Sequence, residues 1–213
     1  MKSNEFLDRF GRYNASFSRT DAEQRAMRLR HALIIPRGPR GPHAPHLEFV
    51  HMARLLIGIT ASDTATKAVD STVEYAKMRP IGERLFNGAD DFEIALTEIF
   101  KGEVDFDVRE IVICRSWPEA HIIIKDSQSP EDRTKDKRFI FCTLEPPTHE
   151  KQFCRIDYCV GWAFFHDIWC NLRREMKPKP SKAGWDRALK LQKIKEEQGE
   201  AVAQKWAKEN PLI

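Results

Sequence analysis

Three short runs of β-branched and aromatic residues in the middle of the chain constrain its fold more than any other feature. Val108–Cys114 and Ala120–Ile124 are separated by a segment that contains Trp117-Pro118, a pattern typical of a β-hairpin. Arg138–Leu144 has the same character and predicts a third strand. Helical periodicity prevails on both sides of these runs. The sequence therefore predicts an α+β protein with a small antiparallel sheet.

Helical patterns flank the three predicted strands. One predicted helix spans residues 92–100; Asp90-Asp91 start it and Gly102 closes it. A second, aromatic-rich helix is expected over 160–175. Residues 80–176 are thus expected to form an αβββα module for assembly or regulation. A three-stranded sheet with helices on one face leaves its other face for dimerisation or for docking of the N-terminal helices.

The regions before and after this module lack strand patterns. Residues 1–79 are expected to form an all-helical module, whose second helix begins at the capping box Thr20–Glu23. Residues 177–213 begin with Lys and Pro residues and are expected to form a linker followed by a charged helical tail. The expected helices of the N-terminal module span 4–15, 20–33, 47–59 and 63–78.

The segment Arg37–His43, Arg-Gly-Pro-Arg-Gly-Pro-His, separates two of these expected helices. Proline fixes φ near −65° and lacks an N–H, so the segment is expected to be extended rather than helical. An extended segment with two arginines is suited to a polyanion such as the minor groove of DNA. Together with the helices on either side, it predicts a helix-turn-helix variant with an unusually long connector.

Charge is unevenly distributed, although the net charge of the chain is only +3. Residues 1–79 contain 13 basic and 8 acidic residues, residues 80–176 contain 13 and 19, and residues 177–213 contain 9 and 5. A basic module beside an acidic one favours a polyanionic partner for the first. We therefore expect residues 1–79 to bind double-stranded DNA. The candidate nucleic-acid-binding residues are Arg25, Arg28, Arg30, Arg37, Arg40 and His43, and His46 is a further candidate for a phosphate contact.

Two resemblances point the same way. Arg-Gly-Pro-Arg-Gly-Pro is similar to the core of an AT-hook, although proline follows the central glycine where the AT-hook has arginine. Residues 28–59 as a whole resemble small DNA-binding accessory proteins of bacterial phages and mobile elements. This resemblance implies a regulator or accessory factor that acts on duplex DNA. A homodimer would suit symmetric half-sites.

Cys154, Cys159, His166 and Cys170 are the clearest candidate metal ligands. Their spacing fits no common zinc site, and we interpret them as small core residues rather than ligands. Neither a metal nor another cofactor is therefore expected. No sequence pattern indicates a small-molecule ligand.

A cluster of acidic residues favours a different hypothesis, a metal-dependent nuclease. Asp105, Asp107 and Glu110 flank the first predicted strand, and Glu119 and His121 lie across the hairpin. Carboxylates that converge at a sheet edge can hold Mg²⁺ for phosphodiester hydrolysis. Nuclease-like patterns place a lysine where His121 stands, so we assign no catalytic residue.

An adaptor or inhibitor of another protein is the main alternative to DNA binding. In that hypothesis the open face of the sheet and the tryptophan-bearing C-terminal helix bind the partner. The odd number of cysteines, five, predicts reduced core thiols. Because the sequence lacks an apolar N-terminal leader and a long apolar run, we expect a cytoplasmic protein that does not enter the membrane.

Overall fold

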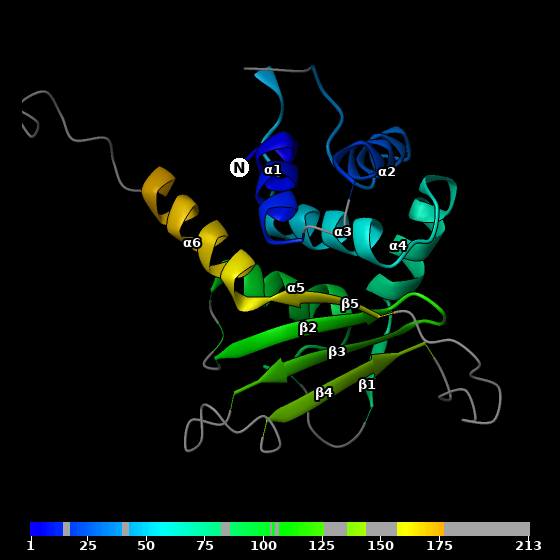
Figure 1. Ribbon diagram of the computed structural model, residues 1–213, viewed down its shortest axis with the longest axis vertical. Helices are drawn as coiled ribbons and strands as arrows, with labels where there is room; N and C mark the ends of the chain where they lie inside the picture. Colours follow the sequence, from blue (N-terminus) through cyan, green and yellow to red (C-terminus); the bar gives the residue numbers. More distant parts are fainter. Residues whose placement is uncertain are drawn as a thin grey trace, which may run out of the picture. The chain divides into compact units, whose positions relative to one another are not determined.

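The computed structural model describes residues 1–14, 18–39, 43–81, 86–102, 104, 107–125, 136–143 and 157–176. These residues form α-helices and an antiparallel five-stranded sheet (Figure 1), which confirms the predicted α+β class. The helices are α1 (Ser3–Tyr13), α2 (Arg19–His31), α3 (Phe49–Thr60), α4 (Ala68–Ala76), α5 (Phe92–Lys101) and α6 (Trp162–Met176). The strands are β1 (Arg79–Ile81), β2 (Val108–Cys114), β3 (Glu119–Ile124), β4 (Lys137–Cys142) and β5 (Asp157–Gly161).

The β2–β3 hairpin forms the centre of the sheet, whose strand order is β1-β4-β3-β2-β5. Ile111 pairs with Ile122 across the hairpin, and both side chains are buried. On the next strand, Phe139 pairs with Ile122 and packs against the core. Because side chains alternate along a strand, these residues share the face that is directed to the helices.

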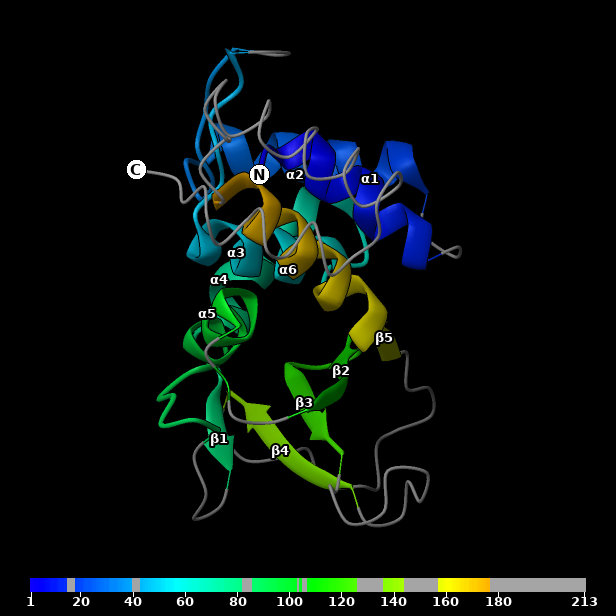
Figure 2. The same ribbon diagram turned by 90° about the vertical axis from the view of Figure 1, so that its left-hand side faces the viewer.

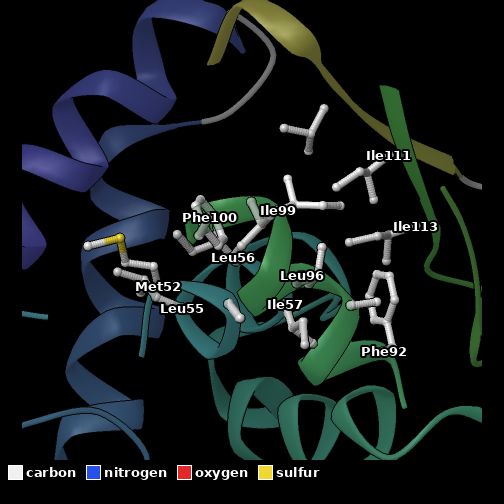
Figure 3. Packing of buried hydrophobic residues seen from close by; sticks show 14 of the residues in the cluster. Met52, Leu55, Leu56, Ile57, Phe92, Leu96, Ile99, Phe100, Ile111 and Ile113 are labelled. Atoms are coloured by element: carbon white, nitrogen blue, oxygen red, sulfur yellow. The ribbon is translucent and has the colours of Figure 1, made fainter. Parts of the chain in front are cut away.

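Helix α5 lies against this apolar face, and Figure 2 shows the sheet curving around it. Asp91 caps the helix, accepting a hydrogen bond from the Ile94 amide at 2.8 Å. Gly102 ends it with a positive φ of 72°, a conformation that glycine adopts without strain. Both predicted boundaries are confirmed. Figure 3 shows side chains of α5, α3 and β2 meeting in one core, among them Leu96, Ile57 and Ile113.

Two of the five strands were not predicted. β1 has only three residues and contains Pro80, and proline is tolerated at such a sheet edge. β5 pairs with β2, so that Val160 lies opposite Ile111. The predicted helix over 160–175 therefore begins two residues late, at Trp162. Strand pairing across the fold overrides the local helical pattern at this point.

The N-terminal helices pack on the side of α5 that is remote from the sheet (Figures 1 and 2). All the helices predicted for residues 1–79 are present, with small shifts at their ends. Ser18, rather than Thr20, caps α2. The expected helix 63–78 is shorter: a 3-10 turn, Ala65–Lys67, leads into α4. The described helices thus lie on one side of the sheet, and docking of the N-terminal helices on its other face does not occur.

Residues Met1–Leu172 form one compact unit, and the predicted boundary at residue 79 falls inside it. The helical tail predicted over 177–213 lies outside the described residues. Within the described part of the chain, no helix has the length and apolarity needed to cross a membrane.

Candidate nucleic-acid interface

Helix α3 is the central helix of the core and not a surface helix. From Leu55 to Thr60 every residue is buried. Gly58 lies so close to its neighbours that an added Cβ would stand 2.7 Å from Cδ1 of Leu29 and from Oγ1 of Thr72. In a helix-turn-helix protein, the second helix of the motif enters the major groove. The second half of α3 is thus enclosed, and Phe49, Val50, His51 and Arg54 in its first half are only partly exposed, so α3 offers little surface for a major groove.

Helix α2, in contrast, has one buried face and one exposed face. Ala22, Ala26 and Leu29 are buried against the rest of the molecule. The opposite face is polar at its N-terminal end and basic at its C-terminal end. Its exposed residues are Thr20, Glu23, Gln24, Met27, Arg28 and His31.

Arg25 belongs to the buried face, and its predicted contact with DNA is wrong. Its side chain is only 2% exposed. Nη1 donates to the carbonyl oxygens of Ile59 and Ser62, both at 2.6 Å. Nη2 donates to Asp21 at 3.1 Å and to the carbonyl oxygen of Asp63 at 3.2 Å. Arg25 thus binds the carbonyl oxygens at and beyond the end of α3, which no later turn of that helix satisfies.

Arg115 has a similar role that the sequence did not reveal. Its Nε donates to the carbonyl oxygen of Thr60 at 2.6 Å. Burial lowers the pKa of Arg25, and the positive charge of Arg115 adds to this effect, while Asp21 opposes it. The sequence of α2 does not show that Arg25 is buried and Arg28 exposed, since both belong to the same run of basic residues.

The connector between α2 and α3 folds back on itself. Gly38 packs against Pro45, and a Cβ on Gly38 would lie 2.7 Å from Cδ of that proline. Farther along, Lys2 and His46 form an isolated β-bridge. Residues 37–39 are non-helical, as predicted, whereas His43 lies in a 3-10 turn; Gly38 and Pro45, on the two branches of the loop, lie side by side. Residues 40–42, which include the candidate Arg40, lie outside the described residues.

A groove of about 440 Å³ separates this loop from α2. One wall is the exposed face of α2, with Gln24, Met27 and His31. The other wall is the loop, with Arg37 and several prolines. The N-terminal residues of α1 complete the lining. Among the candidate residues, the structure thus brings Arg30 and Arg37 to one groove.

The remaining candidates differ in solvent exposure and in the contacts that their side chains make. Arg30 donates a hydrogen bond to Oγ of Ser3 at 2.7 Å and is partly buried. Arg28, Arg37 and His43 are exposed. None of these three forms an ion pair with a residue in the described part of the chain.

The carboxylates around α2 are already paired with other arginines. Arg19 contacts Glu23 at 2.7 Å and also contacts Asp8. Asp21 is paired with Arg25 at 3.1 Å. The acidic residues of this surface are therefore largely neutralised within the protein, while the charges of Arg28 and Arg37 remain available to an anionic partner.

The candidate metal ligands Cys154, Cys159, His166 and Cys170 are not all within the described residues. Cys154 lies outside them. Cys159 is exposed on β5 rather than buried, and Cys170 of α6 is partly exposed, with Sγ 3.8 Å from the ring nitrogens of His166. The interpretation as a core residue is therefore wrong for Cys159, and Cys170 is only partly buried, whereas Cys114 and Cys142 are buried. No group of three or more His, Cys, Asp and Glu side chains suited to a metal occurs in the described ranges.

Those carboxylates of the nuclease hypothesis that the structure describes do not converge on one point. Asp107 precedes β2 and pairs with Lys125 at 3.0 Å, at the open end of the hairpin. Glu119 lies at the turn end, opposite Cys114. There it contacts Nε2 of His121 at 2.6 Å and accepts a hydrogen bond from Trp117 Nε1. Glu110 lies within β2, and Asp105 is outside the described residues. Asp107 and Glu119 therefore lie at opposite ends of β2, a strand that extends about 3.3 Å per residue. They are too far apart to hold the same metal ion.

Comparison of the chain with models of protein families, with curated proteins and with solved structures yields no match.

Proposed function

We propose that this protein binds double-stranded DNA through the exposed face of α2 and the loop that follows it. The observation that carries the proposal is the separation of charge around α2. Arg19 and Arg25 are engaged by carboxylates, whereas Arg28 and Arg37 are exposed without an ion pair in the described structure. Unpaired surface arginines neutralise phosphates and release counterions when DNA binds.

The side chains on α2 also suit the edges of base pairs. Thr20, Gln24 and Arg28 recur at intervals of four residues and are exposed on the same side of the helix. Gln pairs well with adenine, Arg pairs well with guanine, and Thr accommodates either base pair type in the major groove. Helix α2 has 13 residues, which at 1.5 Å per residue gives a length of roughly 20 Å. This length is suited to one segment of the major groove.

The loop would then contact the DNA backbone beside α2. Arg37 and His43 are exposed on its two branches, and Arg37 also lines the groove. In this arrangement α2 enters the major groove, as the second helix does in a helix-turn-helix protein. The buried α3 supports α2 from below, through the contact of Gly58 with Leu29.

The resemblance of residues 28–59 to accessory proteins of phages and mobile elements extends the proposal to a regulator or accessory factor acting on such DNA. The apolar part of that stretch is α3, which is buried here. The part of the resemblance that bears on DNA is therefore Arg28 together with the Arg/Gly/Pro loop.

Titration of a fluorescent mixed-sequence duplex, followed by anisotropy at several salt concentrations, tests the proposal. We expect the logarithm of the binding constant to fall linearly with the logarithm of the salt concentration. Arg37→Ala removes a phosphate contact and should lower the slope by about 0.9. Arg28→Ala should weaken binding and also reduce the preference among duplex sequences.

Arg138→Ala is the matched control. Arg138 is an exposed arginine on β4, so the variant loses the same charge at a site outside the proposed interface. Affinity and salt slope should remain those of the unmodified protein. Undetectable binding at low salt would overturn the proposal, and so would an equal loss of affinity in all three variants, because binding would then depend only on net charge.

A further inference from the structure

Leu33 has an unusual backbone conformation and an unusually exposed side chain. Its φ is 59°, in the left-handed region, and its side chain is 74% exposed. The residue follows the end of α2, where the Ile34 amide donates to the Leu29 carbonyl at 3.0 Å and the Leu33 amide to the Arg30 carbonyl at 3.2 Å. This is a Schellman motif, in which glycine is the usual residue at the position of Leu33.

Both properties of Leu33 are unfavourable in an isolated molecule. A side chain at a left-handed position strains the backbone, and the exposed apolar side chain gains nothing from burial. Strained residues of this kind occur preferentially at functional sites. The position of Leu33 therefore suggests that its side chain is buried in a complex.

A hollow of about 420 Å³ lies directly beside Leu33. Its apolar lining consists of Leu33 and Ile34 after α2 and of Val73 and Ala76 on α4. Val73 is itself 44% exposed. The surface thus combines an apolar projection with a hollow whose lining is partly apolar and partly charged.

Charges of both signs surround this hollow. Lys77, at its edge, is exposed and forms no ion pair with a described residue. Asp91 caps α5, and Glu93 is bound by Arg54, with Nε to Oε2 at 2.6 Å and Nη2 to Oε1 at 3.1 Å. Of the two acidic residues among those that line the hollow, Glu93 is thus paired with Arg54, and Asp91 is left to pair with a cation from a partner.

We infer that this patch binds a second copy of the same chain. In a two-fold dimer each surface meets itself, so that a projection on one copy faces the hollow on the other. Leu33 of each copy would fill the hollow of its partner, and each Lys77 would approach the opposite Asp91. The presence of a projection, a hollow and both charges in one patch is the complementarity that such a dimer requires. The inference does not rest on the proposed function.

Leu33→Gly tests the inference because it separates interface loss from misfolding. Glycine adopts the left-handed conformation without strain, so the variant monomer should melt at a higher temperature than the unmodified monomer. Its dimer dissociation constant, measured by analytical ultracentrifugation, should rise by about tenfold or more, since a buried apolar anchor is lost. Ile81→Ala, which shortens an exposed side chain on β1, should leave that constant unchanged.

Charge exchange provides the second measurement. Lys77→Glu should weaken the dimer, and Lys77→Glu combined with Asp91→Asn should recover part of the loss, since asparagine still caps α5. A protein that remains monomeric up to high micromolar concentration would overturn the inference. A dimer that Leu33→Gly and Lys77→Glu leave equally strong would also overturn it.

Discussion

Helices α2 and α3 are neighbours in sequence and pack against each other, yet they differ in how much of their surface is exposed to solvent. Helix α3 is largely apolar, and every residue of its second half, from Leu55 to Thr60, is buried. Helix α2 buries one face and exposes a polar and basic one. The difference shows that in this fold α3 supports the core, whereas α2 presents side chains to solvent. Arginines only three residues apart, Arg25 and Arg28, fall on the two sides of this division.

Arg25→Ala is the substitution that should affect the molecule most. It leaves three backbone carbonyl oxygens and Asp21 without their buried cationic partner. Removing one member of such a buried network costs about 3–5 kcal/mol. We expect the free energy of unfolding in urea to fall by that amount. A change below about 1 kcal/mol would contradict the structural role assigned to Arg25.

Gly58→Ala is expected to have the next largest effect. The new methyl group would lie 2.7 Å from side-chain atoms of Leu29 and Thr72, and such overpacking costs about 1–3 kcal/mol. Gly11→Ala is the matched control, since a Cβ at Gly11 meets no atom within 4 Å. The same substitution should there stabilise the protein by about 0.5–1 kcal/mol. Thermal unfolding of the two variants should therefore shift in opposite directions.

Tyr75→Phe tests how α4 is joined to the sheet. The Tyr75 hydroxyl is within 2.6 Å of the Cys114 carbonyl oxygen and 2.9 Å of that of Trp117, and it donates toward both. Its loss should cost about 1 kcal/mol. Burial raises the pKa of this hydroxyl, and the nearby Cys114 adds to the shift.

The raised pKa of Tyr75 predicts how this effect depends on pH. The stabilisation is fully present below about pH 10, the pKa of an unfolded tyrosine, and decreases as the pH rises above that value. The difference in unfolding free energy between the unmodified protein and Tyr75→Phe should therefore be smaller at pH 10.5 than at pH 8. A difference that grows over this interval would contradict the assigned contacts.

Arg28→Ala is expected to change stability least. Arg28 is exposed and forms no ion pair with a described residue, so the free energy of unfolding should remain within about 0.5 kcal/mol. The same variant should lose affinity for duplex DNA. Weaker DNA binding together with a large loss of stability would place Arg28 with Arg25, in the core, and remove the distinction between the two faces of α2.

The sequence predicted those elements whose signals are local. The start of α5 was predicted at Asp90-Asp91 and its end at Gly102, because capping residues act within one turn. The β2–β3 hairpin was predicted because its two runs are adjacent. β1 and β5 were missed, since a short strand that contains Pro80 and a strand joined directly to a helix form only through pairing with distant strands.

In the candidate site, too, the sequence predicted local features but not contacts between distant residues. The basic character of α2 was evident from the sequence, but not the face on which each arginine lies. Arg25 is buried because α3 ends beside it, with carbonyl oxygens that need donors. The folding back of the loop, with Gly38 against Pro45, is a contact between residues seven apart that no periodic pattern reveals.

A titration of the ¹⁵N-labelled protein with a short duplex, followed by amide chemical shifts, tests the central claim most directly. We expect the largest shift changes at Thr20, Gln24, Arg28 and His31 on α2 and at Arg37 in the loop, with little change along the buried residues of α3. Changes confined to the sheet, or an absence of change at low salt, would contradict the assignment of α2 as the helix that binds DNA.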